Sequence, residues 1–186
     1  MDARPTSHVD IELLPPAAAG DGELVAEITG LVNGVYAVAE EGLWVERATR
    51  TTTTAMAEMI AAWQIAVARM DGQIVGAVRI RQLDAGRGEF GVLVADPARR
   101  GEGVGSELVI FAEELSRQRG LAVMQLELLV PRGWTHPNKE LLHAWYTRMG
   151  YRPVRSGTID ESYPGLAPLL ATPCDFVVYH KDLTRP

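Results

Sequence analysis

The feature that most constrains the fold is a glycine-rich segment between a strand-like run and a helix-like run. Glu89 to Ala95 is apolar and partly β-branched and ends at Asp96-Pro97, which is typical of a strand followed by a turn. From about Val104 to Arg119 apolar residues recur every three or four positions, which predicts an amphipathic helix. Leu121 to Val130 predicts another strand. A strand, a helix and a strand in this order predict a crossover between two parallel strands.

The rest of the chain predicts further strands and helices around this unit. Asp71-Gly72 joins two β-rich runs and favours a tight hairpin turn, so part of the sheet is antiparallel. We expect a mixed α/β fold, with a mostly antiparallel sheet of six to seven strands and about four helices. The further strands are expected at residues 9–14, 64–70, 73–81, 151–156 and 175–182, and the further helices at 24–35, 55–63 and 139–149.

Composition narrows the class of protein. With 186 residues, 47% of them hydrophobic, we expect one globular domain spanning residues 1–186. The net charge of −6 argues against a nucleic-acid partner. No run approaches the roughly 18–20 apolar residues of a membrane span. Cys174 is the one cysteine, which excludes an internal disulfide, and a cytoplasmic protein is expected. The histidines show no metal-ligand spacing, so no metal is expected.

The glycine-rich segment is suited to binding an anion. Gly101, Gly103 and Gly105 let the backbone approach a ligand closely, and the helix that begins there offers free N–H groups. Arg99 and Arg100 add positive charge, so the segment favours a phosphate or pyrophosphate. A P-loop is excluded because no Gly-Lys-Ser/Thr follows. The dinucleotide fingerprint fits poorly, because its third glycine would fall on Ser106.

At these residues the sequence resembles the GNAT superfamily of N-acetyltransferases. Arg100 to Gly105 matches the family signature Gln/Arg-x-x-Gly-x-Gly/Ala at a strand-to-helix junction. Leu93 to Pro97 is similar to the family's Leu-x-Val-x-Pro strand end, with Ala95 in place of the usual valine. Trp145 to Tyr151 is similar to the Tyr-x-x-x-Gly-Phe/Tyr segment. The order of elements also fits from the first strand to the last.

The resemblance implies that acetyl-CoA is the cofactor. The backbone from Arg100 to Ser106 would hold the pyrophosphate, and the edge of a strand would bind the pantetheine arm where two parallel strands splay. Many relatives also place an asparagine seven residues before the tyrosine. That position is Lys139 here, and Asn138 is one residue earlier. The cofactor-binding residues expected from the resemblance are Leu93, Val94, Ala95, Arg99, Arg100, Gly101, Gly103, Val104, Gly105, Ser106 and Asn138.

The resemblance also implies a catalytic arrangement, with direct transfer in a ternary complex. Tyr146 looks like the family tyrosine that donates a proton to the leaving thiolate. Glu89, on the strand before the cofactor contact, is the candidate base that takes the proton of the amine, acting through water. His136 is the alternative base.

The acceptor is expected to be a primary amine of a small molecule or an amino-acid-like compound. In this superfamily the first two helices, their loop and the last strands frame the acceptor. Here Glu40 and Glu41 could attract a cationic amine, while Tyr36 and Trp44 could form walls. Residues 157–173 could cap the pocket. A protein or peptide acceptor and a non-catalytic acyl-CoA-binding module are the alternatives, and a homodimer is expected by analogy.

Overall fold

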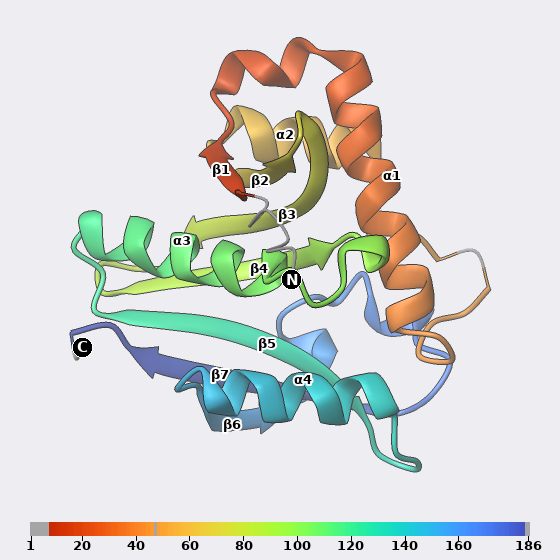
Figure 1. Cartoon of the computed structure of the whole chain (residues 1–186). Coiled ribbons are helices and arrows are strands. Elements are labelled where there is room, and N and C mark those ends of the chain that lie inside the picture. The colour runs from red at the N-terminus through yellow and green to blue at the C-terminus, as the bar shows by residue number, and fades with distance from the viewer. Residues whose placement is uncertain (1–7, 47, 185–186) are drawn as a thin grey trace, which may run out of the picture. The chain divides into compact units, whose positions relative to one another are not determined.

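The computed structural model describes residues 8–46 and 48–184. Figure 1 shows the helices and strands in the expected chain order. The helices are α1 (Gly22–Ala39), α2 (Thr53–Ala61), α3 (Val104–Gln118) and α4 (Pro137–Arg148). The strands are β1 (Asp10–Leu13), β2 (Ile65–Met70), β3 (Gln73–Gln82), β4 (Arg87–Ala95), β5 (Val123–Pro131), β6 (Arg152–Gly157) and β7 (Cys174–Asp182). Four short 3₁₀ helices complete the described elements: η1 (Pro16–Gly20), η2 (Pro97–Arg99), η3 (Ile159–Glu161) and η4 (Ala167–Leu169).

The strands form a seven-stranded mixed sheet in the order β1-β2-β3-β4-β5-β7-β6. The pairs β1–β2, β2–β3, β5–β7 and β6–β7 are antiparallel. The pair β4–β5 is parallel, as the strand–helix–strand pattern predicts. The expected mixed α/β class is therefore confirmed.

The chain divides into two compact units. Among the described residues, unit 1 comprises 8–35, 51–81 and 90–115, and unit 2 comprises 36–46, 48–50, 82–89 and 116–184. The single domain over residues 1–186 stays a prediction.

In unit 1 local sequence signals explain the main elements. The β2–β3 hairpin turns through Asp71 (φ +52°) and Gly72 (φ +79°), which confirms the expected Asp-Gly turn. Thr52 caps α2, because its hydroxyl accepts a hydrogen bond of 3.1 Å from the N–H of Ala55. Gly76 in β3 is packed tightly, since a Cβ there would lie 2.8 Å from Val104 at the start of α3. The absence of a side chain at Gly76 therefore lets the beginning of α3 pack closely against β3.

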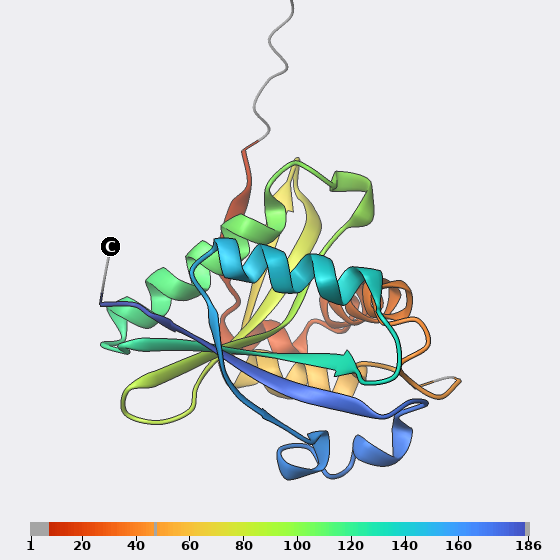
Figure 2. The ribbon, with the colours of Figure 1, turned by 90° about the horizontal axis from the view of Figure 1, so that it is seen from below.

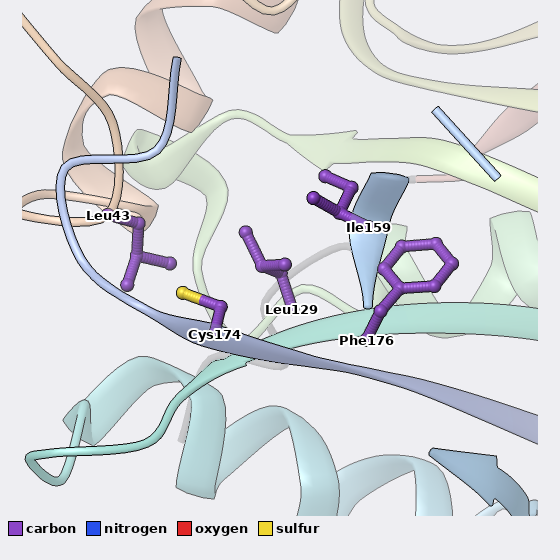
Figure 3. Packing of buried hydrophobic residues seen from close by; sticks show 5 residues of the cluster. All are labelled: Leu43, Leu129, Ile159, Cys174 and Phe176. Atoms are coloured by element: carbon purple, nitrogen blue, oxygen red, sulfur yellow. The ribbon is translucent and has the colours of Figure 1, made fainter. Parts of the chain in front are cut away.

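In unit 2 a long β5–β7 ladder separates two layers. It runs from Val123↔Asp182 to Pro131↔Cys174, and β6 pairs with the other edge of β7. Figures 1 and 2 show α4 on one face of these strands and the segment of η3 and η4 on the opposite face. Buried apolar side chains fill the space on that opposite face, away from α4 (Figure 3): Leu43, Leu129, Ile159, Cys174 and Phe176.

The helix boundaries differ from the sequence expectation by up to four residues, and α2 lies two residues earlier than expected at both ends. α1 continues to Ala39, so the first helix is longer than the apolar spacing suggested. α4 begins at Pro137, two residues early, because proline is well accommodated in a first helical turn. The buried residues of α4 include Lys139 and Tyr146. Within residues 8–46 and 48–184, no helix has the length and apolarity that a membrane crossing requires.

Candidate active site

The glycine-rich loop of unit 1 has a conformation that glycine makes possible. Gly101 has φ +89° and Gly103 has φ +84°, in the left-handed region that other residues rarely adopt. A Cβ at either position would meet no atom within 4 Å, so the backbone faces open space there. The carbonyl of Gly103 accepts the N–H of Glu107 at 3.0 Å, so Gly103 caps α3. The N–H groups at the start of a helix have no partner inside the helix, and they favour an anion.

The loop is anchored to the end of β4. The Asp96 N–H donates to the Val75 carbonyl at 2.8 Å, and the Asp96 side chain accepts from the N–H of Ala98 at 2.9 Å. These bonds fix the turn from β4 into η2. Arg99 forms an ion pair with Glu102 at 3.6 Å, so its charge is partly compensated, whereas Arg100 is exposed. Leu93, Val94 and Ala95 are the last three residues of β4, directly before Asp96.

Val92 interrupts β4 just before Leu93. Its φ is +50°, an unusual value for a β-branched residue, and it marks local strain in the strand. The parallel ladder with β5 comprises the pairs Arg87↔Val123, Gly88↔Met124 and Glu89↔Gln125. A left-handed residue three positions after Glu89 turns the strand's peptide groups away from a regular ladder. Such irregularities occur often beside functional sites, and no sequence signal pointed to this one.

Tyr146 lies on α4 in unit 2 and is buried, with 6% of its surface exposed. Its ring contacts the rings of Trp145 and Tyr151 at centroid distances of 4.9 and 6.0 Å. Burial raises the pKa of the Tyr146 phenol far above its usual value, and the nearby Tyr36 phenol raises it further. The hydroxyl therefore stays protonated at neutral pH, as a proton donor must.

Glu40 is buried in an ion pair instead of being displayed to solvent. The ammonium of Lys139 lies 2.5 Å from Glu40 Oε1, and both side chains are less than 10% exposed. Trp44 Nε1 donates to Glu40 Oε2 at 2.6 Å. Its charge is thus compensated inside the protein, which corrects the expectation that Glu40 attracts a cationic amine. Glu41 is exposed, so its predicted role stays a prediction.

Asn138 and His136 lie beside this ion pair on α4. Asn138 Nδ2 donates to the carbonyl of Ala39 at 3.0 Å, so its amide N–H₂ group holds the end of α1, and its predicted cofactor contact stays a prediction. His136 is the N-cap of α4 and is 7% exposed. Its Nδ1 is buried and has no hydrogen-bond partner among residues 8–46 and 48–184.

Glu89 belongs to a hydrogen-bonded network that links three strands of unit 2. Gln125 Nε2 lies 3.4 Å from Glu89 Oε2 and 3.2 Å from Glu127 Oε1. Gln125 Oε1 lies 3.0 Å from Nε2 of His180. Because the amide nitrogen faces two carboxyl groups, the amide oxygen must accept from His180, and Nε2 carries that proton. The hydroxyl of Tyr163 donates to Glu127 Oε2 at 3.0 Å.

The loop after α1 and the segment before β7 are joined by backbone hydrogen bonds in unit 2. Trp44 and Leu170 form an antiparallel bridge. The N–H of Val45 donates to the Leu169 carbonyl at 2.8 Å, and the N–H of Ala171 donates to the Leu43 carbonyl at 2.9 Å. The sequence expectation treated these segments as two separate parts of an acceptor pocket. The backbone hydrogen bonds join the two segments directly.

The structure groups the predicted site residues by unit. Unit 1 holds the whole predicted set from Leu93 to Ser106, and unit 2 holds Tyr36, Glu40, Glu41, Trp44, Glu89, Asn138 and Tyr146. Sequence reasoning missed Arg50, whose guanidinium carbon lies 4.8 Å from the centroid of the Tyr36 ring. It also missed the network of Gln125 with Glu127 and His180. Neither belongs to a short motif, and only the pairing of distant strands reveals the network.

Comparisons with known proteins agree with this geometry. The family model described as "Acetyltransferase (GNAT) domain" matches residues 61–153, half of the chain. No curated protein matches.

Solved structures resemble the chain over nearly its whole length. They include the PaiA N-acetyltransferase of Thermoplasma acidophilum in complex with coenzyme A (TM-score 0.68, 12% identity, covering 94% of this chain and 99% of that one). An aminoglycoside 6′-acetyltransferase type Ii has a TM-score of 0.63 at 17% identity, covering 94% and 97%. N-acetylglutamate synthase from Neisseria gonorrhoeae, with coenzyme A and N-acetyl-glutamate, has a TM-score of 0.63 at 16% identity. The match covers 96% of this chain but only 36% of the synthase.

Proposed function

Because this chain belongs to the GNAT family of acetyltransferases, we propose that it transfers the acetyl group of acetyl-CoA to a primary amine. The acceptor is a small molecule or an amino-acid-like compound. The main observation in support is the loop at the start of α3. There Gly101 and Gly103 have left-handed φ values, and their backbone faces open space. Coenzyme A in the PaiA and N-acetylglutamate synthase structures supports the choice of cofactor.

The residues of unit 1 suit the cofactor. The N–H groups from Gly103 to Ser106 would bind the pyrophosphate, and the exposed Arg100 adds positive charge. A side chain at Gly101 or Gly103 would occupy the open space that this ligand needs. The backbone of Leu93, Val94 and Ala95 would bind the pantetheine arm in the manner of an added strand. Acetyl-CoA supplies the activated acyl group.

The residues of unit 2 suit the chemistry. The attacking amine must lose a proton, and we assign that step to Glu89 acting through water. Nitrogen then bonds to the acetyl carbon, the carbon–sulfur bond breaks, and the thiolate leaves with the electron pair. Tyr146 donates its proton to the sulfur, because its buried hydroxyl remains protonated. Tyr36 and Trp44 form walls on the acceptor side.

A thermal-shift titration with acetyl-CoA, coenzyme A and NAD tests the cofactor first. A ligand that binds the folded state raises the melting temperature, so acetyl-CoA should raise it and NAD should not. A thiol-release assay with a panel of amines then tests turnover. Absence of any shift with acetyl-CoA contradicts the proposal, and a shift without thiol release from any amine leaves a binding module instead of an enzyme.

A further inference from the structure

Two cationic side chains lie near the buried carboxylate of Glu40 in unit 2. Lys139 is paired with Glu40 at 2.5 Å, and Trp44 binds the other oxygen of the same carboxylate. Arg50 interacts electrostatically with Glu40 and with the phenols of Tyr36 and Tyr163. The two cations, Lys139 and Arg50, therefore share one buried carboxylate, while Glu41 and Glu46 of the same loop are exposed. Within the described residues Arg50 has no ion pair of its own.

Arg50 is placed to meet a ligand. Arg50 is exposed. Its guanidinium lies over the ring of Tyr36, which is half-buried. Stacking on an aromatic ring holds a guanidinium in one orientation, and the N–H groups that do not bind the Tyr36 hydroxyl remain at its edge. These groups match the two oxygens of a carboxylate.

Negative charge lies on β4 and β5 of unit 2, at Glu89 and Glu127. Tyr163, which interacts with Arg50, donates its hydroxyl to Glu127 at 3.0 Å. Gln125 connects Glu127 to Glu89, at 3.2 and 3.4 Å. Tyr163 and Gln125 thus connect the two carboxyl groups, Glu127 and Glu89. A ligand that carries both a carboxylate and an amino group matches these two kinds of charge.

We propose that Arg50 binds a carboxylate of the acceptor, so that the enzyme acetylates amino-acid-type amines in preference to amines without a carboxylate. This inference rests on the proposed function and names the substrate class for the same site. N-acetyl-glutamate, bound in the similar synthase structure, belongs to that chemical class. The amino group faces the Glu89 end, where its proton is removed.

The experiment compares each amino acid with the amine that lacks its carboxylate, for example phenylalanine with phenethylamine. Wild-type protein should use the amino acid better. Arg50→Gln should raise the KM of the amino acid about 10- to 100-fold and change that of the matching amine less than about twofold. Arg50→Lys should recover part of the affinity, because it keeps the charge and loses the planar fork. Arg132→Gln is the control, since that surface arginine pairs with Asp175 at 2.6 Å.

Two results would overturn the assignment of Arg50. One is an equal effect of Arg50→Gln on both members of a pair, including no effect on either. The other is a wild-type preference for amines without a carboxylate, such as spermidine.

If acetyl-CoA binds and no amine releases thiol, the proposed function fails by itself. Calorimetric titration of N-acetyl amino acids into protein saturated with coenzyme A then decides the role of Arg50. Binding that is lost in Arg50→Gln supports it, and unchanged or absent binding contradicts it.

Discussion

At the scale of single residues, the environment of Tyr146 determines its protonation. The phenol is buried, and desolvation raises its pKa far above the usual value near 10, with the Tyr36 phenol adding to the effect. A group of this kind cannot act as a base at neutral pH, but it can donate a proton to a departing thiolate. Its ring also packs against Tyr151, so a structural contribution must be separated from a chemical one.

Replacing Tyr146 with phenylalanine makes that separation. We expect kcat to fall about 100-fold, the lower range of general acid catalysis, because the proton donor is lost. The dissociation constant of acetyl-CoA should stay within about twofold, measured by calorimetry. Since the hydroxyl stays protonated, wild-type kcat should show no loss from Tyr146 ionisation below pH 10. Tyr151→Phe, a buried neighbour, should leave kcat unchanged. A collapse of cofactor affinity in Tyr146→Phe would make the tyrosine structural.

Gln125 is expected to position Glu89. Glu89→Gln should lower kcat/KM for the amine at least about 100-fold, because the base is lost. Gln125→Leu should lower it about 10-fold while acetyl-CoA affinity holds. The double variant should be no slower than Glu89→Gln alone, since Gln125 acts through Glu89. A full additional 10-fold loss in the double variant would show that the two act independently.

The same network can be observed without turnover. Burial, together with the charge of Arg87, lowers the pKa of His180, so the imidazole is neutral at pH 7. Long-range nitrogen NMR should then find the His180 proton on Nε2 in the wild type. Gln125→Leu removes the acceptor at 3.0 Å and should change this signal. A proton on Nδ1 alone in the wild type would contradict the assigned orientation of the amide.

At the scale of elements, the start of α3 combines a backbone requirement with an electrostatic one. Gly103 has φ +84° and caps the helix, and open space lies where its side chain would be. The same N–H groups that would bind the pyrophosphate are left free because they begin a helix. Gly76 supports this arrangement in unit 1, because a larger residue there would press on Val104.

The substitution Gly103→Glu tests whether the start of α3 binds the pyrophosphate. A carboxylate beside the pyrophosphate should abolish coenzyme A binding in calorimetry. The left-handed φ should cost about 1–3 kcal/mol of stability, too little to unfold a domain of ordinary stability. Gly103→Ala is the matched control, since it carries the same backbone strain without the charge and should keep measurable binding. Undiminished binding of coenzyme A by Gly103→Glu would rule out this loop as the phosphate site.

At the scale of the whole molecule, the buried pair Glu40–Lys139 links stability to pH. Burial alone would raise the pKa of Glu40. The ammonium of Lys139, the guanidinium of Arg50 and two hydrogen bonds outweigh it, so the pKa of Glu40 lies below its ordinary value near 4.5. A carboxyl whose pKa is depressed by folding stabilises the folded state above its unfolded pKa. That contribution is lost as the pH falls below about 4.5 and through the folded pKa.

Removing one partner should be more harmful than removing both. Lys139→Met leaves a buried carboxylate without its cation and should destabilise the fold by about 3–5 kcal/mol. For a chain of this size that lowers the melting temperature by about 6–20 °C. Glu40→Gln combined with Lys139→Met should recover much of this loss and give a flatter melting temperature between pH 3 and 6. Equal melting temperatures of the single and double variants would show that the pair contributes little.

The sequence by itself determined the elements and the glycine-rich loop that we propose binds the cofactor, because both depend on local chemistry. Apolar spacing predicts strands and helices, Asp71-Gly72 predicts its own turn, and glycines mark backbone that only they adopt easily. The acceptor side was decided by tertiary structure. Glu40 and Lys139 are 99 residues apart, and Tyr163 and Glu127 are 36 apart. Whether a carboxylate attracts a ligand or pairs inside the protein depends on which distant side chain the fold brings within about 3 Å, and no local pattern encodes that.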